Sequence, residues 1–279
     1  MKETYYTLMC VRDSEKSIDE VMTSLVSQTY QPGKVIVVDD GSTDKTSEIL
    51  TNFKNNYPDL IEVLGTDSKT RDYARIPRLW NMCLQKDYDY HLIAAGDSIF
   101  SQDYAEKIIT KMSSNPRIAI ASGIYGKQRI DFPHGAGRFV KQSFFFKFYD
   151  KYPEKIGYET ETLYRALINN YEISVFKNAK FEHAEKLGHK HNFIEFGQSM
   201  KAMGYHPLYV LGRCFLELVK NDNIGRKGSL NMLWNYLTFK PQKSGYFTLF
   251  SQDVRHQIRE IQSRKIKHLL KEAFTKSKK

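Results

Sequence analysis

The chain has 279 residues, of which 41% are hydrophobic and 13% aromatic, so its composition is that of a folded globular protein and excludes a disordered one. No segment approaches the roughly eighteen apolar residues of a membrane-spanning helix, and the first residues lack the apolar centre of a signal peptide, so we expect a cytoplasmic protein. The net charge of +10 is concentrated in residues 255–279, where nine Lys or Arg accompany two Glu, which favours a local anionic partner.

Hydrophobic periodicity predicts a regular alternation of strands and helices over the first 113 residues. Such alternation is typical of an α/β fold in which a mainly parallel sheet is flanked by helices and ligands bind at the carboxyl ends of the strands. The expected strands are residues 4–11, 34–39, 61–65 and 90–95, and the expected helices are 17–27, 43–55, 76–85 and 102–113.

Beyond residue 116 the pattern is less regular. We expect a strand at 118–122, a glycine-rich loop at 134–138, an aromatic core segment at 144–149, a helix at 159–169, and strands at 173–176 and 180–183. Residues 1–212 are expected to form the catalytic domain, and residues 213–279 a basic, helical C-terminal extension. Within that extension a helix at 230–239 and a final helix from 254 to 274 are expected, and Trp80, Trp234 and Tyr236 are expected in the core.

The run VIVVDDGSTDKT, residues 35–46, has the layout of a nucleotide site. A buried strand leads into Asp39 and Asp40, then a glycine that permits a tight turn, then hydroxylated residues that suit a helix start. Carboxylates at the end of a parallel strand can accept hydrogen bonds from a base or ribose. We therefore predict that Asp39 and Asp40 bind the nucleoside, whereas Ser42 and Asp44 cap the following helix.

Together with the opening strand, the longer phrase LVSQTYQPGKVIVVDDGSTDKT, residues 25–46, resembles the start of a family 2 glycosyltransferase of the GT-A fold. The resemblance covers roughly the first two thirds of the chain and becomes weaker along it. It implies a Rossmann-like sheet that binds a nucleotide-diphosphate sugar, with a uridine-diphosphate sugar as the expected donor and a guanosine-diphosphate sugar as the alternative.

The resemblance also implies a site for Mg²⁺ or Mn²⁺ after the strand at 90–95. The family has an Asp-x-Asp triplet there, which falls on Ala95, Gly96 and Asp97, so the first acid is missing in this chain. Asp97 is then the retained metal ligand, since divalent cations of this kind prefer hard oxygen ligands. Gly96 is expected to let the backbone approach the diphosphate, and His183 is expected to reach the cation or the diphosphate. His189 and His191 are weaker candidates, and a helix-capping acid is the alternative for Asp97.

Three arginines near the start of the helix at 76–85 are candidates for the donor diphosphate: Arg71, Arg75 and Arg78. A diphosphate attracts guanidinium groups, and the amino end of a helix adds its own dipole. An ordinary surface role is the alternative for at least one of them.

The segment GYETETL, residues 157–163, resembles the family's Gly-x-Glu-Asp-x-Glu-Leu helix start, which presents the catalytic base. The acid at that place is Glu159, with Glu161 as the second candidate. Inverting transfer needs one carboxylate beside the acceptor hydroxyl to remove its proton. Stabilising the amino end of the helix is the alternative role for both residues.

The expected function is an inverting glycosyl transfer to a glycan or lipid-linked acceptor, such as a surface-glycan precursor. A catalytically inactive GT-A module that binds nucleotide or glycan is the alternative, because the metal triplet lacks its first acid. The basic final helix is expected either to contact an acidic membrane surface, which would make the protein peripheral, or to pack on the domain or on a second subunit of a homodimer. No nucleic-acid partner is expected.

Overall fold

The computed structural model describes residues 3–67, 73–126, 132–184, 193–220 and 224–276. The chain forms two compact units, the first made of Met1–Pro153 and Arg165–Glu185 and the second of Glu154–Tyr164 and Lys186–Lys279. We expected a boundary between residues 212 and 213, but helix α8 (Pro207–Lys220) runs through that point. A continuous helix that packs on its neighbours on both sides of residue 212 cannot be divided there.

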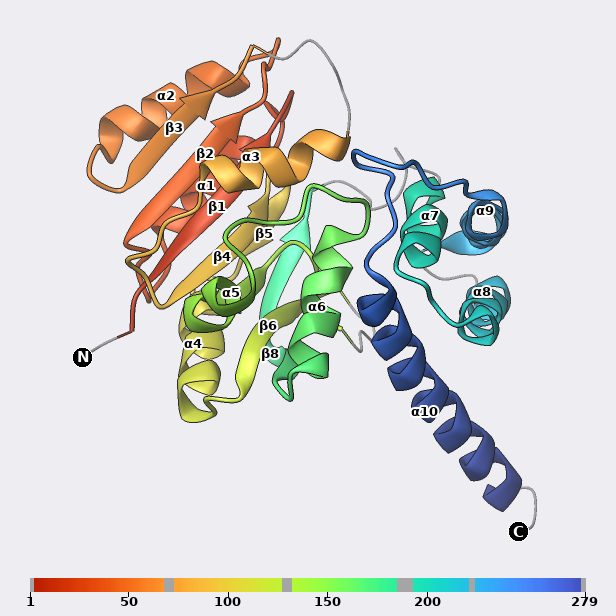
Figure 1. The fold of residues 1–279 in the computed structure, drawn as a ribbon. Coiled ribbons are helices and arrows are strands. Elements are labelled where there is room, and N and C mark those ends of the chain that lie inside the picture. The colour runs from red at the N-terminus through yellow and green to blue at the C-terminus, as the bar shows by residue number, and fades with distance from the viewer. Residues whose placement is uncertain (1–2, 68–72, 127–131, 185–192, 221–223, 277–279) are drawn as a thin grey trace. The chain divides into compact units, whose positions relative to one another are not determined.

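The first unit contains, within the described residues, an eight-stranded sheet with the order β3-β2-β1-β4-β7-β6-β8-β5 (Figure 1). β1, β2, β3 and β4 pair in parallel, as does β6 with β8, whereas β7 is antiparallel to β4 and β6 and β5 is antiparallel to β8. The expected mainly parallel α/β sheet is therefore confirmed. The strands are β1 (Tyr5–Val11), β2 (Lys34–Asp39), β3 (Ile61–Gly65), β4 (Tyr90–Ala95), β5 (Ser98–Phe100), β6 (Ile118–Tyr125), β7 (Arg138–Lys141) and β8 (Glu172–His183).

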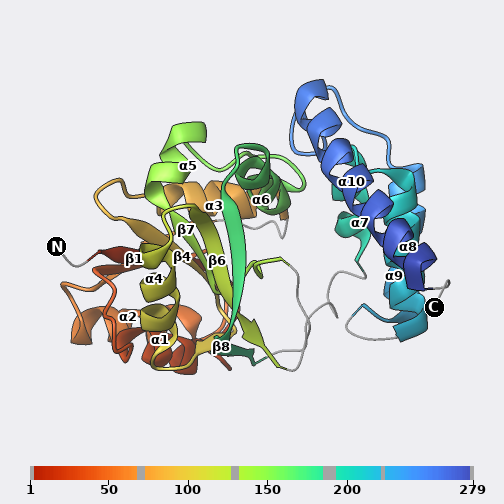
Figure 2. The ribbon, with the colours of Figure 1, turned by 90° about the horizontal axis from the view of Figure 1, so that it is seen from below.

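Helices cover both faces of this sheet (Figure 2). α1 (Ile18–Val26), α2 (Thr46–Asn56) and α4 (Tyr104–Ser114) lie on one face, and α3 (Ile76–Met82) and α5 (Gln142–Phe148) lie on the other. α1 shows why the periodicity was informative, because its buried Ile18, Val21, Met22 and Leu25 recur at helical spacing and form one apolar stripe.

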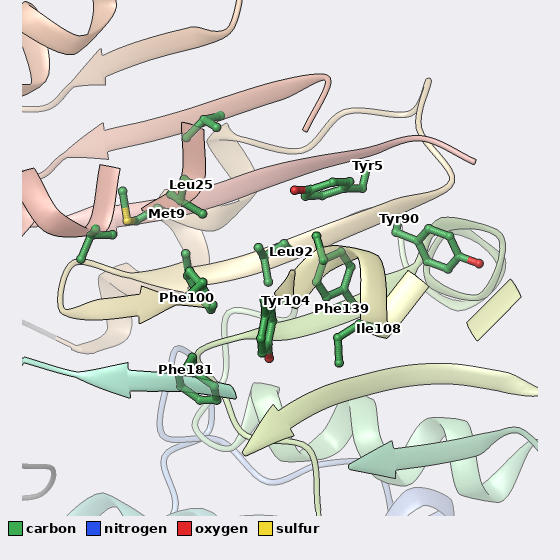
Figure 3. Packing of buried hydrophobic residues seen from close by; sticks show 14 of the residues in the cluster. Tyr5, Met9, Leu25, Tyr90, Leu92, Phe100, Tyr104, Ile108, Phe139 and Phe181 are labelled. Carbon is green, nitrogen blue, oxygen red and sulfur yellow. The ribbon is translucent and has the colours of Figure 1, made fainter. Parts of the chain in front are cut away.

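The core of the first unit is rich in aromatic side chains, with Tyr104 at a central place (Figure 3). Its ring packs 4.9 Å from that of Phe100 and 5.8 Å from that of Phe181, measured between centroids. Its hydroxyl donates a hydrogen bond to the Gly137 carbonyl at 2.5 Å and accepts one from the Gly123 amide at 2.8 Å. A single α4 residue thus holds β5, β6, β8 and the start of β7 together, which fixes the strand ends that carry the site.

Three elements of this unit differ from the sequence-based expectation. The two strands expected at 173–176 and 180–183 are one strand, β8, which shifts register against β6. The strand β7 begins at the end of the expected glycine-rich loop, and the aromatic segment forms the short helix α5, with Phe144 and Phe145 in the core as expected. Elements of three to seven residues contain too few side chains for a period to be recognised.

On β4, His91 is fully buried and lies among polar partners from the α5 side of the sheet. Its Nε2 lies 2.6 Å from the Tyr152 hydroxyl and its Nδ1 lies 3.3 Å from Oε1 of Gln142. Burial lowers the pKa of His91 to about 3, although the bond to Gln142 acts in the opposite direction. The ring is therefore neutral in the folded protein at neutral pH.

We expect the free energy of unfolding to fall as the pH drops from about 6.5 towards 3, because the unfolded chain binds a proton on His91 that the folded chain does not. At about pH 5 this difference amounts to about 2 kcal/mol. Urea unfolding at several pH values should show a shallower acid dependence for His91→Gln than for the intact chain. The exposed His256 provides the control, since His256→Gln should leave the acid dependence as it was.

The second unit is helical and contains α7 (Ile194–Ala202), α8, α9 (Gly225–Thr238) and α10 (Gln252–Lys276). α7 and α9 approach closely, because a Cβ added at Gly197 would lie 2.1 Å from the Met232 carbonyl oxygen. The first turns of α10 belong to this unit's core, with Val254 and Ile258 buried. The packing of this helix on its own unit, one of the two alternatives for the tail, is thus observed for its first half.

The helix α6 (Tyr158–Ile168) belongs to both units, since the division falls after Tyr164. Its first two turns are tied to the second unit: the Ile156 amide donates to the Tyr246 carbonyl at 2.9 Å, and Gln262 Nε2 donates to the Tyr164 hydroxyl at 2.9 Å. The two candidate bases, Glu159 and Glu161, therefore lie in a segment fixed by helices that are distant in sequence.

Candidate active site

The carboxyl ends of three adjacent parallel strands bring the candidate donor residues to one edge of the sheet. Val11 of β1 is opposite Asp39 of β2, and Cys10 is opposite Ala95 of β4. The acids that follow β2 and β4 therefore flank the end of β1. The expected gathering of Asp39, Asp40 and Asp97 at this edge is observed.

Asp39 is buried and bonds to its own loop. One carboxylate oxygen accepts hydrogen bonds from the Ser42 amide at 3.0 Å and the Ser42 hydroxyl at 2.6 Å, and the other accepts one from the Ser47 hydroxyl. These bonds shape the turn between β2 and α2. In this arrangement Asp39 fixes the loop that borders this edge of the sheet.

Asp40 has a different environment, because cations surround it. Arg75 Nη2 lies 2.5 Å from Oδ1 and its Nε donates to Oδ2 at 3.3 Å, while Arg12 Nη1 lies 4.0 Å from Oδ2. The Thr66 hydroxyl donates to Oδ1 at 2.8 Å. The repulsion between adjacent carboxylates is thus offset, and Arg75, expected at a diphosphate, is held in a two-point contact with Asp40.

The loops after β1 and β2 are bonded to each other, which the sequence did not indicate. Asp13 accepts hydrogen bonds from the Thr43 amide at 2.8 Å and its hydroxyl at 3.1 Å. Asp44 accepts from the Thr46 amide and hydroxyl and from the Glu15 amide; these bonds lower its pKa against the opposing effect of burial. Asp44 thus accepts from the first residue of α2, although Lys45 is at the cap position, and Ser42 bonds to Asp39 and Asp13 and does not cap the helix. Arg12 and Asp13 are additional residues of the site's rim.

Asp97 and His183 lie together at the end of β4 and the end of β8. The strand β5 that follows Asp97 pairs Ser98 with His183, and the Ala184 amide donates to the Asp97 carbonyl at 2.8 Å. His183 Nδ1 lies 3.1 Å from Asp97 Oδ1, although the two groups are not aligned as a hydrogen bond. Both ring nitrogens of His183 are buried, and within the described residues neither has a hydrogen-bond partner, so the imidazole offers a ligand atom beside an acid.

Gly96 has a packing role at this corner. A Cβ at this position would lie 2.9 Å from Cγ1 of Val11, and the Ser17 hydroxyl donates to the Gly96 carbonyl at 2.7 Å. The alternative role of Asp97 as a helix cap is not observed, since α4 begins at Tyr104 with Asp103 at its cap position. Asp97, the acid after β4, therefore lies beside His183 and not at the start of α4.

His134 is a neighbour that sequence reasoning missed. Its ring centroid lies 5.4 Å from that of His183, and the ring of Tyr125 lies beside both. Burial, with help from His183 and Arg138, lowers the pKa of His134 to about 4, so this imidazole is neutral at pH 7. No spacing signal connects two histidines that come together only through the pairing of β6 with β8.

The remaining candidates differ in what is known of their places. Arg78 is exposed on α3, whereas Arg71, His189 and His191 lie outside the described residues. In the second unit Glu159 is half-buried, and the Tyr158 hydroxyl is 3.4 Å from its carboxylate. Glu161 is almost fully buried, with 1% of its surface exposed. Of the two acids, Glu159 is the more accessible to an acceptor.

The contrast between Asp39 and Asp40 can be tested with nucleoside diphosphates. Asp40→Asn should weaken binding of UDP or GDP about tenfold and also lower the Tm, because the buried carboxylate loses its charge-assisted contact with Arg75. Asp39→Ala should lower the Tm as well, because three hydrogen bonds within the loop disappear. Calorimetric titration and thermal unfolding would measure both, with the exposed Asp59→Asn as control. Equal affinity in Asp40→Asn and the control would remove Asp40 from the nucleotide site.

A twisted, mainly parallel sheet with an inserted antiparallel strand, helices on both faces and acids after β2 and β4 is the arrangement of the GT-A fold. The chain belongs to the glycosyl transferase family 2, whose family model matches residues 6–171. Both the fold and the family expected from the sequence are therefore confirmed.

The curated relatives match less than half of this chain. Poly-beta-1,6-N-acetyl-D-glucosamine synthase of Staphylococcus aureus (strain COL) is 27% identical over 122 residues, which is 42% of this chain and 27% of that protein. The same enzyme of Staphylococcus epidermidis is 25% identical over 118 residues. The chain thus matches about a quarter of the length of these relatives.

Solved structures share the fold at low sequence identity. The mannosyltransferase PcManGT of Pyrobaculum calidifontis, in complex with GDP-Man and Mn²⁺, has a TM-score of 0.61 at 13% identity and covers 85% of this chain and 73% of its own. Residues 1–349 of TarS from S. aureus, in complex with UDP-GlcNAc, give 0.57 at 16% identity, with 84% and 71% covered. Among the described helices of our chain, none has the length and apolar content required to span a bilayer.

Proposed function

We propose that the protein transfers a sugar from a nucleotide-diphosphate sugar to an acceptor hydroxyl with inversion at the anomeric carbon. The observation that carries this proposal is the pairing of Asp97 with an otherwise unpartnered His183 at the sheet edge that also bears Asp40. This arrangement supports a donor site in which the nucleoside lies near Asp39 and Asp40 and the diphosphate near Asp97.

The residues after β4 and β8 fit a divalent cation such as Mg²⁺ or Mn²⁺. Asp97 offers a hard carboxylate oxygen and His183 a buried ring nitrogen without a partner, and both are ligands that Mn²⁺ accepts. No set of three His, Cys, Asp or Glu in the described parts of the chain is arranged to hold a metal. Donor diphosphate and water would therefore complete the coordination, as they commonly do around Mg²⁺. A cation bound there offsets the charge of the leaving diphosphate.

This chain's own groups provide the remaining chemistry. Glu159 removes the proton of the acceptor hydroxyl as a general base, and Tyr158 orients its carboxylate. Arg75 holds Asp40 in place, and Gly96 keeps the chain after β4 close to β1. Arg78, exposed at the start of α3, and Arg71 are assigned to the donor phosphates. Glu161, which is buried in the first turn of α6, stabilises the amino end of that helix.

The donor is proposed to be a uridine-diphosphate sugar, with a guanosine-diphosphate sugar as the alternative; the solved neighbours hold UDP-GlcNAc in one case and GDP-Man in another. The acceptor is proposed to be a glycan or a lipid-linked glycan precursor, since the matched curated relatives are polysaccharide synthases. The basic second half of α10 is assigned to an acidic membrane surface, with a homodimer contact as the competing role.

Thermal unfolding with a panel of UDP- and GDP-sugars, with and without Mn²⁺, tests the donor assignment. We expect a bound donor to raise the Tm, and the rise to be larger when Mn²⁺ is present, because both ligands bind the folded state. Release of UDP or GDP from the stabilising sugar nucleotide would then show turnover. Stabilisation without any release, for every sugar and acceptor tried, would favour the inactive nucleotide-binding module.

A further inference from the structure

The outward face of α8 is apolar, the reverse of the usual pattern for a surface helix. Val210 and Cys214 face the interior of the unit, while the opposite side carries large apolar side chains, among them Phe215 with 64% of its surface exposed. Around the outer face of α8, the exposed residues whose side chains are described are Leu208, Leu211, Gly212, Phe215, Leu216 and Val219, together with Pro207 at the helix start.

α9 continues this surface. It packs beside α8, with the Ser229 hydroxyl donating to the Cys214 carbonyl at 2.7 Å. Its inner face carries Gly228, Ser229, Met232 and Tyr236, and its outer face carries Leu230, Trp234 and Leu237. Trp234, which we expected in the core, is 67% exposed, so that expectation is wrong. Small residues on the inner faces let the two helices approach, and the large apolar residues are left outside.

The exposed apolar side chains of α8 and α9, two helices that pack side by side, favour a partner, since large exposed apolar patches mark sites of association. Cations accompany it. Arg226 and Lys227 are exposed in the first turn of α9, and a groove of about 480 Å³ between the start of α8 and α10 is lined by His256, Arg259, Arg264 and Lys267. His206 and Pro207 also line this groove, directly before Leu208, so the groove opens where the apolar stripe of α8 begins.

The chain from residue 193 to residue 276, which contains α7 to α10, is positively charged overall. Residues 193–276 contain 14 Lys or Arg against 6 Asp or Glu, a net charge of +8 out of +10 for the chain. Glu260 is the one carboxylate among the residues that line the groove, and it lies 3.6 Å from Arg264. The surface therefore combines apolar side chains, a tryptophan and an excess of cations, the composition that suits the interface of an anionic bilayer.

We propose that the outer faces of α8 and α9 dock on the surface of an anionic membrane, with their apolar side chains in the interfacial layer and the groove between α8 and α10 facing lipid phosphates. A second copy of the chain is the less suitable occupant. A two-fold contact would bring two copies of this positively charged surface together, including Arg226 and Lys227 of each copy, and the like charges would oppose the association. Docking through this face does not depend on the proposed glycosyl transfer.

Sedimentation of the full chain with lipid vesicles tests this proposal. We expect binding to vesicles of phosphatidylcholine with phosphatidylglycerol, and weak binding to phosphatidylcholine alone. On binding, the emission of Trp234 should shift to shorter wavelength and be quenched by lipids brominated in their acyl chains, whereas the buried Trp80 should not respond. The double variant Phe215→Gln, Trp234→Gln should reduce vesicle partitioning about tenfold or more, because two large apolar side chains no longer leave water.

Matched variants in the first unit serve as controls. Tyr57 and Met82 are also large, apolar and exposed, so Tyr57→Gln, Met82→Gln should leave vesicle binding unchanged. Arg264→Gln, Lys267→Gln should weaken binding to anionic vesicles alone, whereas the exposed pair Lys54→Gln, Lys111→Gln should not. Equal binding of both apolar double variants, or no vesicle binding by the intact chain, would overturn the proposal. A dimer in analytical ultracentrifugation that only Phe215→Gln, Trp234→Gln dissociates, without vesicle binding, would assign the face to a second copy.

Discussion

Replacing Asp97 by asparagine should reduce glycosyl transfer about 10³-fold and abolish its dependence on Mn²⁺. The amide is a poor ligand for a hard divalent cation, and the several kcal/mol that such a cation contributes to the transition state correspond to a change of this size. The side chain is one quarter exposed and its carboxylate lies 3.1 Å from His183 Nδ1, so the fold should persist. Steady-state transfer measured against Mn²⁺ concentration, with Mn²⁺ binding followed by electron paramagnetic resonance, would check both parts.

Asp103 offers a control in the same stretch of chain. It is at the cap position of α4 and pairs with Lys107 at 2.5 Å, so Asp103→Asn should change stability slightly and the Mn²⁺ dependence not at all. The activity of His183→Ala should lie between those of Asp97→Asn and Asp103→Asn, because Mn²⁺ binding is weakened but not lost. Full Mn²⁺-dependent transfer by Asp97→Asn would show that the cation is held elsewhere.

Replacing Glu159 by glutamine should lower the rate of transfer about 10² to 10⁴-fold while the affinity for the donor stays as it was. Only removal of the acceptor proton is lost, since glutamine has the same shape and can keep the contact with Tyr158. Single-turnover transfer would measure the chemical step, and nucleotide titration would measure donor affinity. A raised pH should not restore the rate, because an amide does not ionise.

Glu161 distinguishes a base from a structural acid. With 1% of its surface exposed, it is inaccessible to an acceptor hydroxyl, so Glu161→Gln should act mainly on the Tm. If Glu161→Gln instead abolished transfer at unchanged stability while Glu159→Gln remained active, the base would be Glu161. Changes in both variants in proportion to their Tm would mean that neither carboxylate removes the proton.

The sequence predicted the first half of the fold well because long elements with clear periods come in regular alternation there. β1 to β4 and their helices lie within a few residues of the expected ranges. The short strands β5 and β7 were missed, since their places depend on Tyr104 and on pairing with distant strands. The apolar residues of α8 did not indicate that most of them are exposed, because periodicity alone does not show which face of a helix packs against the rest of the protein.

The sequence predicted which acids lie at the strand ends of the candidate site, but it did not predict which side chains they contact. Asp39, Asp40 and Asp97 are at the expected edge, yet the division between a loop-holding Asp39 and an arginine-paired Asp40 depends on Ser42, Ser47 and Arg75. The meeting of Asp97 with His183 depends on the register of β5 against β8. Such contacts are set by tertiary pairing, which a single sequence does not encode as a local pattern.

The division of α6 between the two units has an evolutionary consequence. With the proposed roles, residues of the sheet unit determine which donor binds. The position of Glu159 depends instead on the second unit, because Ile156 and Tyr164 bond to residues later in the chain. Recombination that exchanges residues 186–279 between relatives would then alter which acceptor is activated and leave the donor preference in place. A substitution at Gln262, about a hundred positions from the base, would then affect activation of the acceptor more than binding of the nucleotide.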